Sequence, residues 1–263
     1  MKTVLAIQLF LFCSSINGFS QTSKPKYIEV EGKAIEDIKI VTELVDAYVY
    51  KSSIDLTNLE PNNKKKLFIN LMLPSILIAK FKLEQTRISV VALVNSKDAI
   101  SPKDEEYLAR LRKSYKCSTN IELIARLHTH PTSIVIAQAA LESGWGTSRF
   151  YKQANNIFGV WSYNKNEARI KASEDRDGTA IYVKKYESLP ESIASYFKTL
   201  ARGPYQTFRA ERVQTKDVYQ LINHLTVYSE LRDEYVSRLE SLIRFNKLEQ
   251  YDNYTLKVSP HEY

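Results

Sequence analysis

Cysteine is scarce in this chain of 263 residues, and its scarcity excludes some forms of stabilisation and catalysis. The two cysteines are Cys13 and Cys117. Cys13 lies in an N-terminal segment that we expect to be removed, so the mature chain cannot form an internal disulfide and must be held together by its core. Cys117 follows basic residues, but no motif couples it to a histidine, which disfavours a cysteine nucleophile.

Histidine is also scarce, and the four histidines do not form a metal-binding set. His128 and His130 are two positions apart, whereas His224 and His261 stand far along the chain. A catalytic zinc ion needs three protein ligands, and no acidic residue closely follows the histidine pair to supply the third. We therefore expect no metal and no other cofactor, and Pro131 indicates a simple turn at this point.

The N-terminus has the composition of a secretory signal peptide. Lys2 precedes an apolar run over residues 4–12, which is the expected order of charged and apolar regions. The run is too short to span a membrane, and the bulky Phe12 before Cys13 argues against a lipoprotein cysteine. We expect residues 1–20 to be removed and the protein to be exported to the periplasm or cell envelope.

A basic charge balance indicates an anionic partner. The chain carries 37 basic and 30 acidic residues, a formal charge of +7; removal of residues 1–20 takes away one lysine and leaves +6. Such a charge steers an exported protein toward an anionic polymer or a membrane surface. No nucleic-acid motif is present, so a nucleic-acid partner is not expected. The oligomeric state is left open.

The length favours one main domain with an extension, and the pattern before residue 128 is mostly helical. Residues 21–31 are expected to be a flexible leader, and residues 56–66 a polar connection. Pro74 should kink or interrupt the helix that contains it. The expected helices cover residues 34–50, 67–82, 104–115 and 120–127.

The most informative stretch is QAALESGWGTS, residues 138–148, because it places Glu142 at the end of an apolar helix. Apolar residues recur at helical spacing from Ile134 onward, and Gly144 favours a helix end. The helix dipole and partial burial both oppose a negative charge there, so we expect a raised pKa for Glu142, as a general acid requires. A solvated glutamate, or one that caps a neighbouring amide, is the alternative.

Two motifs carry a resemblance to a known family. AQAALESGWGTSR, residues 137–149, and NNIFG, residues 155–159, resemble the glucosaminidase domain of bacterial cell-wall hydrolases, and more narrowly its Bax-like branch. The resemblance spans about residues 65–247. It implies a mainly α, lysozyme-like catalytic domain with a small β-hairpin lobe and an N-terminal helical extension, with Glu142 as the catalytic acid. Further segments in the family's order are residues 66–75, 186–193, 205–212 and 228–235.

The resemblance also implies an activity and a division of the chain. The implied reaction is hydrolysis of β-1,4 bonds after N-acetylglucosamine in peptidoglycan, with glycan strands as the partner. A muramidase or lytic transglycosylase, a peptidoglycan amidase, and a non-catalytic peptidoglycan-binding module are the alternatives. The expected division is a signal peptide (1–20), a leader with an N-terminal helix (21–64), a helical extension packed on the catalytic domain (65–127), the catalytic domain (128–250) and a C-terminal tail (251–263).

A second carboxylate is expected in a β-hairpin over the cleft. The turn signal at residues 177–178 and the strand-like residues 179–186 predict this hairpin. Glycoside hydrolysis usually needs a second carboxylate as nucleophile or base, although charged hairpin tips are also commonly there for solvation. The candidates are Glu167, Glu174, Asp175 and Asp177.

Tyr228 resembles a recurrent tyrosine of the family, although Ser229 and Glu230 follow where many relatives have Ala-Thr-Asp. The resemblance implies a hydrogen bond to the reaction centre or to an acetamido group; a core tyrosine is the alternative. Aromatic rings near the motif can stack on sugars or pack a core. The substrate-binding candidates are Trp161, Asn156, Phe158 and Ser143.

Overall fold

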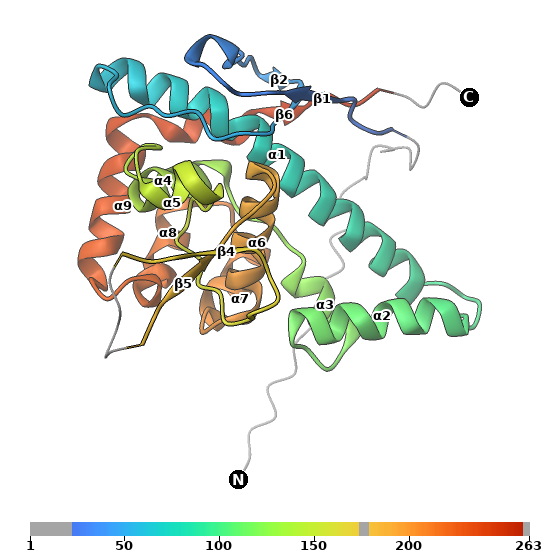
Figure 1. The fold of residues 1–263 in the computed structure, drawn as a ribbon. Coiled ribbons are helices and arrows are strands. Elements are labelled where there is room, and N and C mark those ends of the chain that lie inside the picture. Colours follow the sequence, from blue (N-terminus) through green and yellow to red (C-terminus); the bar gives the residue numbers. More distant parts are fainter. Residues whose placement is uncertain (1–22, 174–178, 260–263) are drawn as a thin grey trace.

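The computed structural model describes residues 23–173 and 179–259, and in these ranges the fold is mainly α (Figure 1). The predicted signal peptide and three of the four candidate carboxylates, Glu174, Asp175 and Asp177, lie outside the described residues. The helices are α1 (Pro61–Val94), α2 (Pro102–Tyr115), α3 (Asn120–Arg126), α4 (Thr132–Ser143), α5 (Arg149–Ala154), α6 (Leu189–Arg202), α7 (Gln206–Gln214), α8 (Val218–Ile222) and α9 (Asp233–Phe245), with short 3₁₀ helices η1 (Ile35–Asp37), η2 (Asn223–Tyr228) and η3 (Leu248–Asn253).

Helix α4 lies at the centre of the main core. Every residue from Thr132 to Ala140 is buried, and α4 contacts α1, α9 and η3. A helix that is apolar on all sides must be surrounded by other elements. The few polar side chains of α4 therefore need partners inside the core: Ser133 bonds Asp252 with both its backbone N–H and its hydroxyl, each at 2.7 Å.

Helix α1 joins two cores. Its first half, from Phe68 to Ala79, is buried in the main core, whereas Val90 belongs to a smaller cluster with residues of α2 and α3. The helix begins at Pro61, earlier than expected, because the Glu60 carboxylate accepts hydrogen bonds from the first free backbone N–H groups. Pro74 lies inside the helix, and Figure 1 shows α1 changing direction partway along its length.

The expected helix over residues 34–50 is wrong. This region instead holds β2 (Leu44–Val45) and β3 (Ala47–Tyr50), and β3 pairs in parallel with β1 (Tyr27–Val30), inside the expected flexible leader. Val45 and Ala47 are buried two positions apart, which is strand rather than helix spacing. Strand β2 pairs with β6 (Thr255–Leu256), so the expected C-terminal tail is partly built into the fold.

The predicted antiparallel strand pair is confirmed, whereas the expected turn at residues 177–178 lies outside the described residues. Strands β4 (Arg169–Lys171) and β5 (Tyr182–Lys184) pair antiparallel, and an isolated bridge joins Trp161 to Val183 of β5. The mainly α fold, the small hairpin lobe and the preceding helical extension are thus all present. None of the described helices is long and apolar enough to cross a membrane.

Replacing Phe68 by alanine should test the dependence of the fold on the first half of α1. Phe68 is fully buried, so Phe68→Ala should lower the free energy of unfolding by about 3–5 kcal/mol in urea denaturation. Phe245→Ala is the matched control, because Phe245 is 81% exposed, and it should change the free energy by less than about 1 kcal/mol. Equal losses would contradict this account of the core.

Candidate active site

A strained turn holds Glu142 at the end of α4. After Ser143, the residues Gly144, Trp145 and Gly146 have φ values of 58°, 57° and 79°, and glycine tolerates this left-handed region best. At Gly146 a Cβ atom would come within 3.1 Å of the Phe68 ring. The chain therefore turns back on itself immediately after the carboxylate, as the sequence predicted for Gly144.

The environment of Glu142 opposes its ionisation. The side chain is half-buried, and the Tyr235 hydroxyl donates a hydrogen bond to Oε1 at 3.0 Å. Burial raises the pKa of Glu142, and the bond from Tyr235 offsets only part of that rise. Glu142 is therefore neither fully solvated nor a helix cap, and the expected direction of its pKa shift is confirmed.

Glu142 opens onto a cleft of about 460 Å³ between the hairpin lobe and the helices. One wall carries Trp161 and Tyr163 with Lys184 of β5, and the other is formed by α6, Tyr205 and η2. Among the described residues of the lining, the charged side chains besides Glu142 are Lys184 and Arg202. The lining residues are Glu142, Phe158, Gly159, Val160, Trp161, Tyr163, Lys184, Ser195, Tyr196, Thr199, Arg202, Tyr205 and Tyr228.

Tyr228 lies in the same cleft as Glu142. Its ring stacks on Tyr235, with centroids 5.5 Å apart and planes 16° apart, and the edge of Tyr196 is nearby. Burial raises the pKa of Tyr228 well above its ordinary value. Its phenol therefore stays protonated at neutral pH and is able to donate a hydrogen bond within the cleft.

The aromatic candidates divide into a surface pair and a packed residue. Trp161 is 40% exposed and Tyr163 is 84% exposed, with ring centroids 6.2 Å apart. Phe158 also lines the cleft, but it is 6% exposed and stacks on Tyr196 at 4.2 Å. Trp161 and Tyr163 are thus exposed side chains at the cleft, whereas Phe158 mainly supports Tyr196.

Asn156 and Ser143, which we expected to contact the substrate, are buried, and their side chains form hydrogen bonds with backbone groups. The Asn156 amide donates to the carbonyls of Val160 and Lys184, and it accepts from the Val160 N–H, which ties the loop to β5. The Ser143 hydroxyl donates to the Ala139 carbonyl and accepts from the Gly146 N–H. Both residues shape the site without facing the cleft, because their hydrogen bonds are made within the chain.

Glu167 is the one candidate second carboxylate within the described residues. It accepts a hydrogen bond from Ser162 at 2.7 Å and pairs with Lys184 at 3.0 Å. Burial alone would raise the pKa of Glu167. The hydrogen bonds from Ser162 and Lys184 together lower the pKa by more than burial raises it, so the net shift is downward. Glu167 is thus ionised near neutral pH, beside a lysine that lines the cleft.

The structure also reveals residues that the sequence did not identify as part of the site. Tyr235 bonds Glu142 directly, and Gln138 and Tyr196 stand behind it. Gln138 is one helical turn before Glu142 in the same motif, and this spacing on a buried helix was the available signal. In the described part of the chain, no group of three His, Cys, Asp or Glu side chains could hold a metal ion.

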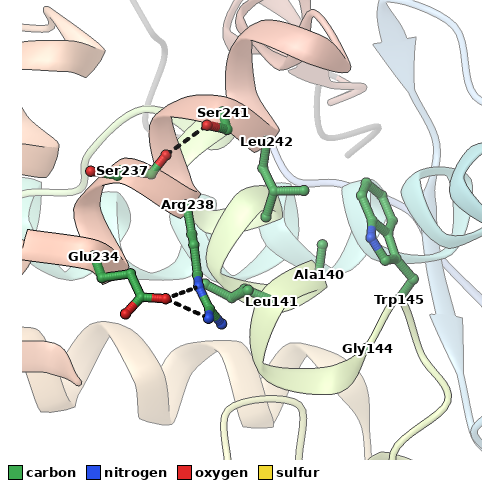
Figure 2. A pocket seen from close by; sticks show the side chains of 9 residues that line it. All are labelled: Ala140, Leu141, Gly144, Trp145, Glu234, Ser237, Arg238, Ser241 and Leu242. Atoms are coloured by element: carbon green, nitrogen blue, oxygen red, sulfur yellow. Dashed lines mark hydrogen bonds and ion pairs between the residues drawn. The ribbon is translucent and has the colours of Figure 1, made fainter. Parts of the chain in front are cut away.

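A second hollow, of about 430 Å³, lies on the other side of the helix end, between α4 and α9 (Figure 2). Arg238 in this hollow pairs with Glu234 at 2.6 Å. Glu142 is absent from its lining, so the hollow is separate from the carboxylate cleft. The lining residues are Ala140, Leu141, Gly144, Trp145, Glu234, Ser237, Arg238, Ser241 and Leu242.

Comparison with known proteins gives one domain match and several relatives. Residues 118–248 match the family model described as glucosaminidase, mannosyl-glycoprotein endo-beta-N-acetylglucosaminidase. Protein bax of Escherichia coli (strain K12) is 29% identical over 162 residues, which are 56% of this chain and 57% of that protein. Exo-glucosaminidase LytG of Bacillus subtilis (strain 168) is 27% identical over 202 residues, 72% of this chain and 68% of that protein.

Among solved structures, the catalytic domain of the autolysin Auto from Listeria monocytogenes is similar, with 28% identity and a TM-score of 0.41. That match covers 65% of this chain and 97% of the other. The chain spans little more than half the length of Protein bax.

Replacing Glu142 by glutamine should make stability less dependent on pH. Because burial raises the pKa of Glu142 in the folded state, ionisation of Glu142 destabilises the fold as pH rises through that pKa. Glu142→Gln should therefore unfold at higher urea concentration than wild type at pH 8, and the difference should shrink toward pH 4. A difference that does not change with pH would contradict a raised pKa.

Proposed function

We propose that this chain, which belongs through residues 118–248 to the glucosaminidase-domain family of cell-wall hydrolases, hydrolyses β-1,4 bonds after N-acetylglucosamine in peptidoglycan. The observation that carries the proposal is the position of Glu142, whose pKa is raised by burial, in the wall of an open cleft. A carboxylic acid whose pKa is raised by its surroundings is suited to protonate a glycosidic oxygen.

Glu142 acts as the general acid in this proposal. Its proton passes to the oxygen of the leaving sugar as the bond from that oxygen to the anomeric carbon breaks. A water molecule then supplies a hydroxyl group to the anomeric carbon, and the remaining proton returns to Glu142 directly or through the second carboxylate. Tyr228 faces the same cleft with a protonated phenol and is the proposed hydrogen-bond donor at the reaction centre.

The second carboxylate works in its charged form, as nucleophile or as base. Glu167 is ionised by its bonds to Ser162 and Lys184, which supports this role for it. Those same bonds also suit a structural role that holds Lys184 at the cleft. Glu174 stays a candidate beside Glu167, and it lies outside the described residues.

The walls of the cleft suit a glycan with carboxylate groups. Trp161 and Tyr163 present ring faces of the kind that stack on pyranose rings. Lys184 and Arg202 bring positive charge to the same cleft, which favours a polymer with acidic stem peptides. Peptidoglycan has both features, so action at the cell envelope is part of the proposal.

Cleavage within the strand is proposed rather than cleavage at its end, because the matching family model is described as an endo-beta-N-acetylglucosaminidase. One relative is named an exo-glucosaminidase, so the position of cleavage needs its own measurement. A muramidase or lytic transglycosylase is the second candidate, since the Glu-Ser-Gly motif is shared with such enzymes. An amidase or a binding module without activity would not need a glutamate with a raised pKa.

The ends of the digested glycan strands should identify the bond that is cleaved. After purified peptidoglycan is digested and reduced with borohydride, we expect reduced N-acetylglucosamine, because hydrolysis after that sugar frees its anomeric carbon. Reduced N-acetylmuramic acid would indicate a muramidase, and anhydro ends a transglycosylase. Intact strands with free peptides would indicate an amidase, and intact strands without any product a binding module. Fragment lengths would separate internal from terminal cleavage.

Two carboxylate variants should separate the acid from the second group. Glu142→Gln should lower turnover at least about a hundredfold, in the range that general acid catalysis supplies, with the fold retained in circular dichroism. Glu167→Ala should lower turnover without lowering the melting temperature if Glu167 takes part in the reaction. A parallel loss of stability and activity in Glu167→Ala would assign it the structural role. Full activity of a folded Glu142→Gln would overturn the proposed acid.

A further inference from the structure

A continuous hydrogen-bond chain runs through the core behind Glu142. His130 Nε2 lies 2.9 Å from the Tyr196 hydroxyl, which is 2.5 Å from Gln138 Oε1. Gln138 Nε2 is 2.9 Å from the Tyr235 hydroxyl, which in turn bonds Glu142 at 3.0 Å. His130 lies just before α4 and Gln138 lies within α4, whereas Tyr196 comes from α6 and Tyr235 from α9.

We propose that His130, Tyr196, Gln138 and Tyr235 form a positioning relay that fixes the orientation of Glu142 and keeps one hydrogen bond directed at its carboxyl group. The inference rests on the proposed function, because it concerns how the proposed acid is prepared. None of the four is proposed to exchange a proton with the substrate.

The relay has one consistent direction. The amide of Gln138 donates to the Tyr235 oxygen, so the single hydroxyl proton of Tyr235 is left for Glu142. The other end of the same amide accepts from the Tyr196 hydroxyl, so the Tyr196 oxygen accepts from Nε2–H of His130. In this series of hydrogen bonds, each donor thus points toward the next residue on the way to Glu142. In such an arrangement the hydrogen bonds polarise one another.

The surroundings of His130 keep it neutral, which suits its place at the start of the relay. His130 is buried against the rings of Tyr196, Phe197 and Phe208. Burial lowers the pKa of His130 well below its ordinary value, and the nearby charge of Arg212 lowers it further. A neutral imidazole carries one N–H, and Nδ1 has no partner among the described residues, so the proton belongs on Nε2.

The relay also explains buried polar groups that would otherwise weaken the core. Gln138 is fully buried, as are Tyr196 and Tyr235 to within 2%, and an unpaired polar group in such a place costs about 1–3 kcal/mol. Together they join α4 to α6 and α9. The same bonds that satisfy these groups therefore tie the orientation of Glu142 to the packing of α6 and α9.

Loss of the relay should raise the pKa of Glu142. The bond from Tyr235 favours the charged carboxylate, so its removal leaves burial unopposed and keeps Glu142 protonated to higher pH. Among the described residues, the other titratable groups that face Glu142 are Tyr196 of α6, Tyr228 of η2 and Tyr205 before α7. Lys184 and Arg202 lie in the same cleft. These groups are unchanged in the variants below.

The test compares Tyr235→Phe and Gln138→Met with Tyr151→Phe in the full-length protein. Tyr151 is the matched control, because its buried hydroxyl donates to the Ile54 carbonyl at 3.1 Å, outside the cleft. We expect both relay variants to lower kcat about tenfold with KM little changed, and to move the alkaline limb of the kcat profile upward by at least about half a pH unit. The control should lose similar stability without moving that limb.

Unchanged pH limbs in Tyr235→Phe and Gln138→Met, or an equal move in Tyr151→Phe, would overturn the relay. A titration of the Glu142 carboxyl by NMR, in wild type and in Tyr235→Phe, tests the same point without any activity. If wild type cleaves no peptidoglycan but the Glu142 pKa still rises in Tyr235→Phe, the proposed function fails and the relay stands. If wild type is active and the pKa does not change, the relay fails alone. If Gln138→Met does not fold, the kcat–pH profile and the NMR titration of Glu142 are both measured in Tyr235→Phe.

Discussion

The burial of α4 on all sides is the constraint on which the rest of the structure depends. A central helix can be surrounded only if other elements cover every face, and α1, α9 and η3 do so here. Its polar side chains then have no access to water and must find partners inside the protein. Ser133 meets Asp252, and Gln138 meets Tyr196 and Tyr235. The hydrogen bonds behind the site are thus a consequence of placing a helix in the core.

The C-terminal end of α4 places Glu142 between the buried core and the cleft. The helix ends at Ser143, and the chain then turns through Gly144, Trp145 and Gly146, three residues of positive φ. Glu142 lies just before Ser143, the last residue of α4, and its side chain is half-buried at the edge of the cleft. A carboxylate with a raised pKa and access to a ligand is the result, because the same position supplies both burial and an opening.

The hairpin lobe completes the cleft by a different route. Asn156 fastens the loop after α5 to β5 through backbone carbonyls, which sets Trp161 and Tyr163 above the helices. Glu167 holds Lys184 at the lining of the cleft. Among the described residues of this lobe, Trp161, Tyr163 and Lys184 therefore line the cleft, and Asn156 shapes its wall.

Local sequence determined the features that depend on neighbours in the chain. The spacing of apolar residues and Gly144 were enough to predict helix α4, its end, and the direction of the Glu142 pKa shift, since all three follow from one short segment. The pairing of β4 with β5 was equally local, because the two strands are consecutive in the chain.

Tertiary structure decided what depends on distant partners. Residues 44–50 have apolar spacing compatible with a helix, but they are strands because residues 27–30 and 255–256 supply backbone partners. From the sequence we expected Asn156 and Ser143 to bind a ligand, but in the fold their side chains form hydrogen bonds with backbone groups. Tyr235 stands 93 positions after Glu142, and no periodicity connects residues so far apart. Only the packing of α9 on α4 brings that hydroxyl to the carboxylate, because a hydrogen bond depends on position in space and not on distance along the chain.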